Sequence, residues 1–356
     1  MKLPRLRVPD SILLKGPGAI LGLTGRAPSW KGLPERRDTP PLSSEPPPGL
    51  PQGRLLHVRR HGELFLRDSG GDGPPLLLLH GWMFPSDLNW FRVYAPLAKA
   101  GYRVIAMDCR GHGRGLRTVR SFRLEDCAAD AAALVRALGC GPATVVGYSM
   151  GGAIAQLIAR DHPAQLRGMV LCATSREWRD LRMRILWNYM GIFRMYIELF
   201  PRDAWRWTLR AAGFPDSPTT SWIASELSRG SALDIAEAGR ELGRFDSREW
   251  IERVSVPASV IVTTEDQAVP PLKQYELARS LDAPSFDVPC DHNGVVVKES
   301  RFDRVLLKAL RSVEERSRGE GAERRRRAET SPRRGRTTRG IVPPASSAES
   351  RRRASA

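Results

Sequence analysis

The serine at position 149 lies in a sequence context that could make its hydroxyl reactive. Residues 143–152 read ATVVGYSMGG, and the β-branched run at the start is typical of a buried strand. The AIAQLIA run that follows has the apolar spacing of a helix. Ser149, between Gly147 and Gly151, therefore matches the Gly-x-Ser-x-Gly elbow, a tight strand-to-helix turn that lifts one hydroxyl above the sheet edge. The alternative is an ordinary turn in which Ser149 only caps the helix.

A serine hydroxyl is a poor nucleophile near neutral pH and needs a base, together with a group that orients the base. The chain supplies candidates for both at the ends of predicted strands, because Asp266 follows SVIVTTE and His292 follows SFDVPCD. The carboxyl ends of parallel strands share one edge of a sheet, which would bring these distant residues into one cleft. Such a set of side chains is suited to acyl transfer, in which the serine attacks a carbonyl carbon.

The elements that must position these residues are predicted by strand and helix patterns that alternate along the chain. A hairpin pattern, LLHVRR and ELFLRD, comes first. The uninterrupted apolar runs LLLL, YRVIAMD, MVLCAT and ASVIVT are typical of strands buried on both faces. An alanine-rich helix is predicted over residues 124–138. The expected fold class is α/β, with a doubly wound, mostly parallel sheet.

The alternation stops after Thr174, where a long helical segment predicts an inserted lid. Six of the nine tryptophans lie in this segment. Most of its aromatic residues are expected to pack the lid on the core, and a minority to line an apolar pocket. The predicted organisation is a mostly disordered Pro/Gly-rich arm (1–52), the first part of the core (53–174), the helical lid (175–252), the second part of the core (253–312) and an Arg-rich disordered tail (313–356).

The net charge of +17 comes mainly from the two predicted tails. Residues 311–356 contain 14 Arg against 6 Glu, a balance of +8, and residues 1–50 contain 8 Lys or Arg against 4 acids, a balance of +4. The remaining +5 belongs to residues 51–310. We therefore expect no nucleic acid on the folded part. A different class of function, a non-catalytic binding protein, would use the Arg-rich tail on nucleic acid or an anionic surface.

The cysteines and the apolar runs indicate in which cellular compartment the protein is expected. The five cysteines form no Cys-x-x-Cys pair, which predicts neither a zinc site nor a disulfide framework and favours a reduced, cytoplasmic setting. Lysine, proline and glycine interrupt the apolar segments within residues 12–23, so that we expect no signal peptide. No run reaches the ~20 apolar residues of a transmembrane helix. Residues 12–23 either pack on the body or make peripheral contact with a membrane. No sequence feature indicates an oligomeric state.

Residues 55–310 resemble the α/β-hydrolase fold superfamily, and within it the serine esterases and lipases that carry a lid. Five motifs in the same order carry this resemblance: His80-Gly81-Trp82, the segment DCRGHG at 108–113, the elbow at 147–152, Thr264-Glu265-Asp266, and Asp291-His292. The order serine, aspartate, histidine is also the order of that family.

The resemblance implies a role for each matched residue. Ser149 would be the nucleophile, His292 the general base, and Asp266 the carboxylate that holds the imidazole in its useful tautomer. The backbone N–H groups of Trp82 and Met150 would form the oxyanion hole. The resemblance requires no metal and no organic cofactor.

Each of these assignments has a competitor in the sequence. Glu265 could replace Asp266 as the orienting acid. His80 and His112 are alternative bases, although the family pattern places both in structural loops, and Asp108 is expected to brace the loop after its strand. Cys290 could make the site sensitive to oxidation, or it could be a small buried apolar residue.

The identity of the nucleophile narrows the expected reaction. Relatives that open epoxides or displace halide carry aspartate at the elbow, whereas this chain carries Ser149. The leading expectation is hydrolysis of a carboxylic ester of a hydrophobic small molecule through an acyl-enzyme. Carbon–carbon bond hydrolases share the Ser-Met-Gly-Gly elbow, but they usually follow the histidine with a tryptophan-bearing segment, and here Asn293-Gly294-Val295 follows it. Perhydrolases and acyltransferases share the triad and remain alternatives.

Overall fold

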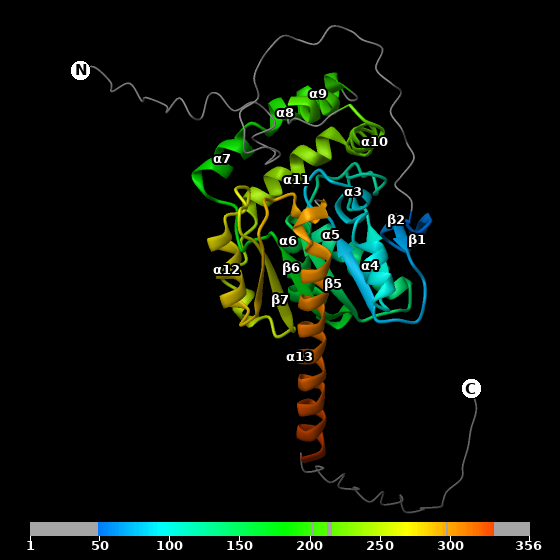
Figure 1. The fold of residues 1–356 in the computed structure, drawn as a ribbon, viewed down its shortest axis with the longest axis vertical. Helices are drawn as coiled ribbons and strands as arrows, with labels where there is room; N and C mark the ends of the chain where they lie inside the picture. The colour runs from blue at the N-terminus through cyan, green and yellow to red at the C-terminus, as the bar shows by residue number, and fades with distance from the viewer. Residues whose placement is uncertain (1–48, 201–202, 212–215, 297, 331–356) are drawn as a thin grey trace, which may run out of the picture. The chain divides into compact units, whose positions relative to one another are not determined.

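The computed structural model describes residues 49–200, 203–211, 216–296 and 298–330, and these residues form one eight-stranded sheet flanked by helices (Figure 1). The predicted arm lies outside the described residues up to residue 48. The order of strands in the sheet is β1-β2-β4-β3-β5-β6-β7-β8. The strands are β1 Gly53–Val58, β2 Gly62–Asp68, β3 Pro75–Leu79, β4 Arg103–Met107, β5 Ala143–Tyr148, β6 Leu166–Cys172, β7 Ala258–Thr263 and β8 Ser285–Val288.

The sheet is parallel from β4 to β8, and it is antiparallel where β1 pairs with β2 and where β2 pairs with β4. Strands β1 and β2 form the predicted hairpin, in which Val58 pairs with Gly62. Strand β3 lies between β4 and β5 and pairs in parallel with both, with Leu78 opposite Val146 of β5. Strand β5 pairs in parallel with β6, so the chain reverses its direction of winding around β3. The predicted doubly wound, mostly parallel sheet is confirmed.

Helices cover both faces of the sheet, which explains why the strands are uninterrupted apolar runs. Leu76 and Leu78 of β3 pack in a core with residues of α3, α4 and α13, while Leu77 and Leu79 pack on the other face with residues of α5, α6 and α12. The helices outside the insertion are α3 Ser86–Trp90, α4 Tyr94–Lys99, α5 Leu124–Ala137, α6 Met150–Asp161, α12 Pro271–Ser280 and α13 Phe302–Thr330.

Five helices of the described chain lie between β6 and β7, where the sequence predicts a helical segment (Figure 1). They are α7 Leu181–Asn188, α8 Met190–Leu199, α9 Asp203–Ala211, α10 Pro218–Leu227 and α11 Ala232–Arg244, which together we call the helical insertion. The side chains of Asp180, Ser217 and Ser231 cap α7, α10 and α11 by accepting a backbone N–H of the first turn. Among the helices described, none has the length and apolar character needed to cross a bilayer.

The C-terminal helix extends past the predicted end of the core. The disordered tail is predicted from residue 313, and α13 runs to Thr330. Val313 is fully buried in the same core as Leu306 and Leu310, at the three- and four-residue spacing of one helix face. The Arg, Glu and Ala residues beyond it are good helix formers, although their composition resembles that of a disordered tail. Residues 331–356 lie outside the described ranges.

Candidate active site

Ser149 occupies a strained turn between β5 and α6. Its backbone has φ 52° and ψ −112°, a conformation that residues other than glycine rarely adopt. The turn is held by the Ser149 N–H, which donates to the Cys172 carbonyl at 2.9 Å. A Cβ on Gly147 would overlap the backbone of Gly151, and a Cβ on Gly151 would overlap the carbonyl of Leu79. The two glycines are therefore needed because backbones cross here at close range.

The structure brings the predicted serine, histidine and aspartate into one hydrogen-bonded chain. His292, in the loop after β8, has its Nε2 atom 3.1 Å from the Ser149 Oγ. Its Nδ1 atom lies 2.7 Å from Oδ2 of Asp266, in the loop after β7. The three residues follow β5, β7 and β8, and they meet because the carboxyl ends of parallel strands share one edge.

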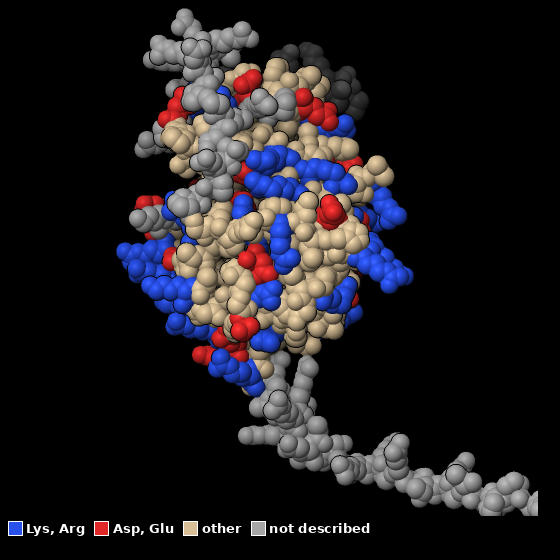
Figure 2. Space-filling model, turned by 90° about the vertical axis from the view of Figure 1, so that its right-hand side faces the viewer, with Lys and Arg blue, Asp and Glu red and all other residues tan. Residues whose placement is uncertain are grey.

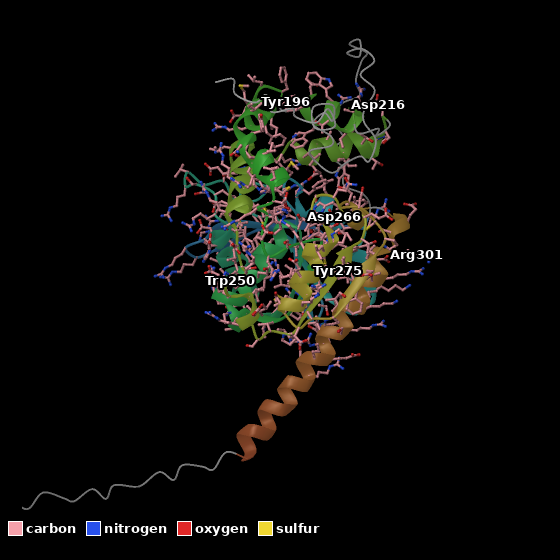
Figure 3. All side chains as sticks on the ribbon, turned by 90° about the vertical axis from the view of Figure 1, so that its left-hand side faces the viewer. Tyr196, Asp216, Trp250, Asp266, Tyr275 and Arg301 are labelled. Atoms are coloured by element: carbon pink, nitrogen blue, oxygen red, sulfur yellow. The ribbon has the colours of Figure 1, made fainter. Side chains whose placement is uncertain are left out.

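Asp266 is buried and held in place from several sides. Its Oδ1 atom accepts the backbone N–H groups of Ala268 and Val269, each at 2.8 Å. Its Oδ2 atom, which contacts His292, also accepts the hydroxyl of Thr263 at 2.7 Å. The carboxylate therefore has a fixed orientation toward the imidazole. Figure 3 shows Asp266 between the sheet and the helical insertion.

Two opposing effects set the basicity of His292. Burial acts to lower its pKa, because a charged imidazole loses solvation. The negative charge and the hydrogen bond of Asp266 act in the opposite direction, and the net result is a pKa raised above the ordinary value of histidine. The side chain is 19% exposed, whereas that of Asp266 is fully buried. An imidazole in this setting can take a proton from the serine and be stabilised as the cation.

The two predicted oxyanion-hole donors belong to adjacent loops. Met150 is the first residue of α6, so its N–H has no acceptor within that helix. Trp82 lies in the loop after β3, in which the Gly81 N–H donates to Oδ1 of Asn89 at 2.8 Å. A Cβ placed on Gly81 would be 3.5 Å from the Cβ of Ser149, so this loop passes directly beside the serine.

The side chain of Trp82 is bound by the helical insertion. Its indole N–H donates to the carbonyl of Ile235, in α11, at 2.7 Å. Its ring lies 5.3 Å from that of Trp187 and 6.0 Å from that of Phe193, measured between centroids. The insertion therefore contacts the same loop that contacts the serine.

The alternative acid and bases predicted from the sequence do not join this chain. Glu265 is exposed, and it is Asp266 that contacts His292. His80 is fully buried and accepts the Cys109 backbone N–H on Nε2 at 2.8 Å; burial lowers its pKa to about 4. His112 is also fully buried, and burial together with the nearby His80 lowers its pKa to about 3. Both histidines are neutral parts of structural loops.

The two remaining candidates from the sequence, Asp108 and Cys290, also lie outside the hydrogen-bonded chain. Asp108 accepts the backbone N–H of Ser86 at 2.7 Å and that of Arg114 at 2.8 Å, and in this way braces the loop after β4. Cys290 is 8% exposed, and burial raises its pKa to about 12. A thiol that stays protonated near neutral pH is not a nucleophile.

Sequence reasoning missed two residues that touch this site. The Tyr148 hydroxyl donates to the backbone carbonyl of His292 at 2.7 Å, and Asn89 orients the loop of Trp82 through Gly81. The position of Tyr148, next to Ser149 in the elbow, indicates that it lies near the site. Nothing in the sequence indicates which group accepts the hydrogen bond of its hydroxyl. Asn89 carries no motif, and its partner follows from the placement of α3 beside β3.

Four of the six tryptophans in residues 175–252 are buried. The buried ones are Trp178, Trp187, Trp205 and Trp222. Trp207 is 40% exposed. Trp250 lines a surface groove of about 830 Å³ between α5, α6 and α11, and the residues that line this groove do not include those of the hydrogen-bonded chain.

Comparisons with known proteins bear on the family of the chain. A family model described as alpha/beta hydrolase fold matches residues 74–204. The chain is 30% identical over 255 residues to the pimeloyl-[acyl-carrier protein] methyl ester esterase of Chromobacterium violaceum, an alignment that covers 67% of this chain and 95% of the relative. It is 38% identical over 222 residues to a non-heme chloroperoxidase of Streptomyces lividans, which covers 58% and 80%.

A solved structure extends the likeness to the fold as a whole. The thermophilic esterase of Thermogutta terrifontis aligns with a TM-score of 0.59 at 24% sequence identity, over 74% of this chain and 99% of the esterase. The strand order, the elbow, the matching family model and the relatives lead to one conclusion: the chain belongs to the α/β-hydrolase fold family.

Proposed function

We propose that the chain is a serine hydrolase that cleaves a carboxylic ester of a hydrophobic small molecule through an acyl-enzyme. The observation that carries this proposal is the hydrogen-bonded chain from Asp266 through His292 to Ser149. An esterase among the relatives, 30% identical over nearly its whole length, supports the choice of bond. The aromatic rings that pack around Trp82, the residue after Gly81 in the loop beside the serine, support a hydrophobic substrate.

In the proposed reaction the Ser149 Oγ attacks the ester carbonyl carbon while the Nε2 atom of His292 takes the hydroxyl proton. The carbonyl oxygen becomes an oxyanion, which the N–H groups of Met150 and Trp82 stabilise. The intermediate collapses, the C–O bond to the alcohol breaks, and His292 returns the proton to the leaving oxygen. A water molecule then repeats the sequence on the acyl-enzyme and releases the acid. The helical insertion acts as the lid that contacts Trp82.

The proposal is tested by Ser149→Ala and by Ser285→Ala, which removes an exposed hydroxyl from the edge strand β8 as a matched control. Purified proteins are assayed on p-nitrophenyl esters of graded chain length and labelled with a fluorophosphonate, followed by mass spectrometry of the modified peptide. We expect Ser149→Ala to lose both turnover and labelling, with an unchanged circular dichroism spectrum. Retained turnover in Ser149→Ala, or labelling at another residue, would refute the assignment.

A second candidate reaction is perhydrolysis, which the chloroperoxidase relative at 38% identity favours. Hydrogen peroxide would replace water as the attacking group on the same acyl-enzyme, so that a peracid is released instead of an acid. The two reactions are separated by measuring peracid from acetate and hydrogen peroxide beside ester turnover. Ser149→Ala should abolish both, and the ratio of the two rates in the unmodified protein identifies the main reaction.

A further inference from the structure

A row of large apolar side chains on α7 and α8 points to solvent. Six residues spaced by three or four positions are between 41% and 73% exposed, and we call them the apolar stripe: Leu181, Ile185, Tyr189, Ile192, Met195 and Leu199. Phe200 and Trp207 add exposed aromatic rings next to it. Most of the large exposed apolar residues of the described chain therefore lie in one helical segment, and a contiguous patch of this kind marks an interaction surface.

The stripe is not needed for the packing of the insertion, because the residues on the opposite side of the same helices pack against the rest of the protein. Ile197 and Met190 of α8 are buried, and the ring of Phe193 contacts those of Trp82 and Trp205. Helix α11 contacts both α7 and α8 from the side of the sheet. In Figure 3, Tyr196 of α8 lies far from Asp266, on the outer part of the insertion. The helices thus have one face on the core and a second apolar face without a partner in the described residues.

The charge of this segment indicates what covers the stripe. Residues 181–211 contain six Arg and two acidic residues, a balance of +4. The stripe itself spans residues 181–199, in which Arg182, Arg184 and Arg194 against Glu198 give a balance of +2. On the face of the molecule shown in Figure 2, Lys and Arg side chains cover more of the surface than Asp and Glu side chains do. Helices with an apolar face, aromatic residues and flanking arginines are typical of segments that lie in the plane of an anionic bilayer.

We propose that the apolar stripe docks on the surface of an anionic phospholipid bilayer, with α7 and α8 parallel to the membrane plane. The apolar side chains enter the boundary between headgroups and acyl chains, and the arginines contact lipid phosphates. This proposal extends beyond the proposed hydrolysis and does not depend on it, because binding to vesicles is measured without turnover.

The test is co-sedimentation of the full chain with vesicles of phosphatidylcholine, with and without phosphatidylglycerol, in the Ser149→Ala background so that no lipid is consumed. Ile192→Glu with Leu199→Glu places two charges on the stripe, at positions 58% and 64% exposed. The matched control is Leu55→Glu with Leu272→Glu, at positions 57% and 62% exposed outside the insertion. We expect the partition coefficient of the stripe variant on anionic vesicles to fall by about tenfold or more. The control should bind as the parent does.

High salt separates the stripe from the basic tails. At about 1 M salt the Debye length falls to about 3 Å, so binding through tail arginines is lost while apolar insertion persists. Leu181→Glu, at a position 73% exposed, is a second stripe variant should the double variant misfold. The proposal is overturned if the parent does not bind anionic vesicles, or if stripe and control variants bind equally. It is also overturned if the parent is a dimer that binds no vesicles and the stripe variant is a monomer, because the stripe would then be a contact between two copies of the chain.

Discussion

The hydroxyl of Tyr148 donates a hydrogen bond of 2.7 Å to the backbone carbonyl of His292, so the residue before the proposed nucleophile holds the loop of the proposed base. Tyr148 is 2% exposed, and its ring contacts those of His292 and Phe302. Burial raises the pKa of Tyr148 well above its ordinary value, which keeps the hydroxyl protonated and able to donate. The strand β5, the histidine loop and α13 therefore meet at one side chain.

Tyr148→Phe should lower kcat by about three- to tenfold and leave KM nearly unchanged. The change removes one oxygen atom, so the His292 carbonyl loses its donor and the loop loses one restraint on the position of the imidazole. The control is Tyr275→Phe, which removes a hydroxyl that bonds to Asp287 on an exposed surface. Steady-state kinetics on a p-nitrophenyl ester measures kcat and KM of both variants. Equal kcat values for the two would count against a positioning role of Tyr148.

Asp266→Asn should lower turnover by about four orders of magnitude, because an amide favours the wrong tautomer of His292 and cannot stabilise the imidazolium. The neighbouring Glu265→Gln changes an exposed carboxylate and should stay within about twofold of the parent. Both variants are compared by kcat/KM under the same conditions. A larger loss in Glu265→Gln than in Asp266→Asn would mean that the acid has been assigned to the wrong residue.

The activity should fall as the pH is lowered through the raised pKa of His292, because only the neutral imidazole can accept the serine proton. The inflection of kcat/KM is therefore expected above about 6.5, the ordinary value for histidine. In Asp266→Asn the opposing carboxylate is gone while burial remains, so the inflection should move to lower pH. A pH profile of each protein measures this, and an unshifted inflection in the variant contradicts the role of Asp266.

The same raised pKa has a consequence for stability, with a defined sign. A histidine whose pKa is higher in the folded than in the unfolded state stabilises the fold below its ordinary pKa, and this contribution is lost as the pH rises through the folded-state value. The difference in unfolding free energy between the parent and Asp266→Asn should accordingly shrink as the pH rises through that range.

The sheet and the meeting of Ser149 with His292 followed from the sequence because both depend on local signals. Strands covered on both faces read as uninterrupted apolar runs, and residues just after such strands share one edge. The contact between Tyr148 and His292 joins residues 144 positions apart, and no periodicity encodes it. The partner of Asn89 is likewise set by how α3 packs beside β3.

The C-terminal helix shows why composition alone misleads. Few apolar residues follow Ser312, and this composition predicts disorder, yet Val313 continues the buried face of α13 into the predicted tail. The Ser317 hydroxyl also donates to the Arg167 carbonyl, at 3.3 Å, and the Arg316 guanidinium donates to the Ala258 carbonyl, at 3.1 Å. These contacts with the core could not be inferred without the positions of β6 and β7.

The attachment of the helical insertion to the core should depend on one buried ion pair. The Arg114 guanidinium, in the loop after β4, donates to both carboxylate oxygens of Glu226, in α10, at 2.8 and 2.9 Å. The Glu226 side chain is fully buried, so the pair is shielded from water, and the guanidinium of Arg114 remains 24% exposed. Neutralising Glu226 removes the two short bonds of Arg114, which keeps the longer contact with Asp87 at 3.4 Å, and it also removes the charge that faces Arg229.

Glu226→Gln should therefore lower the free energy of unfolding by about 2–3 kcal/mol, less than the ~3–5 kcal/mol of a wholly buried pair because Arg114 keeps some contact with water. Glu198→Gln is the control, since it breaks an exposed pair with Arg194 one helical turn away in α8 and should cost at most about 0.5 kcal/mol. Urea unfolding of both variants measures the difference. Equal losses would show that the insertion is held by its apolar contacts, with Trp82 at their centre, and that the ion pair adds little.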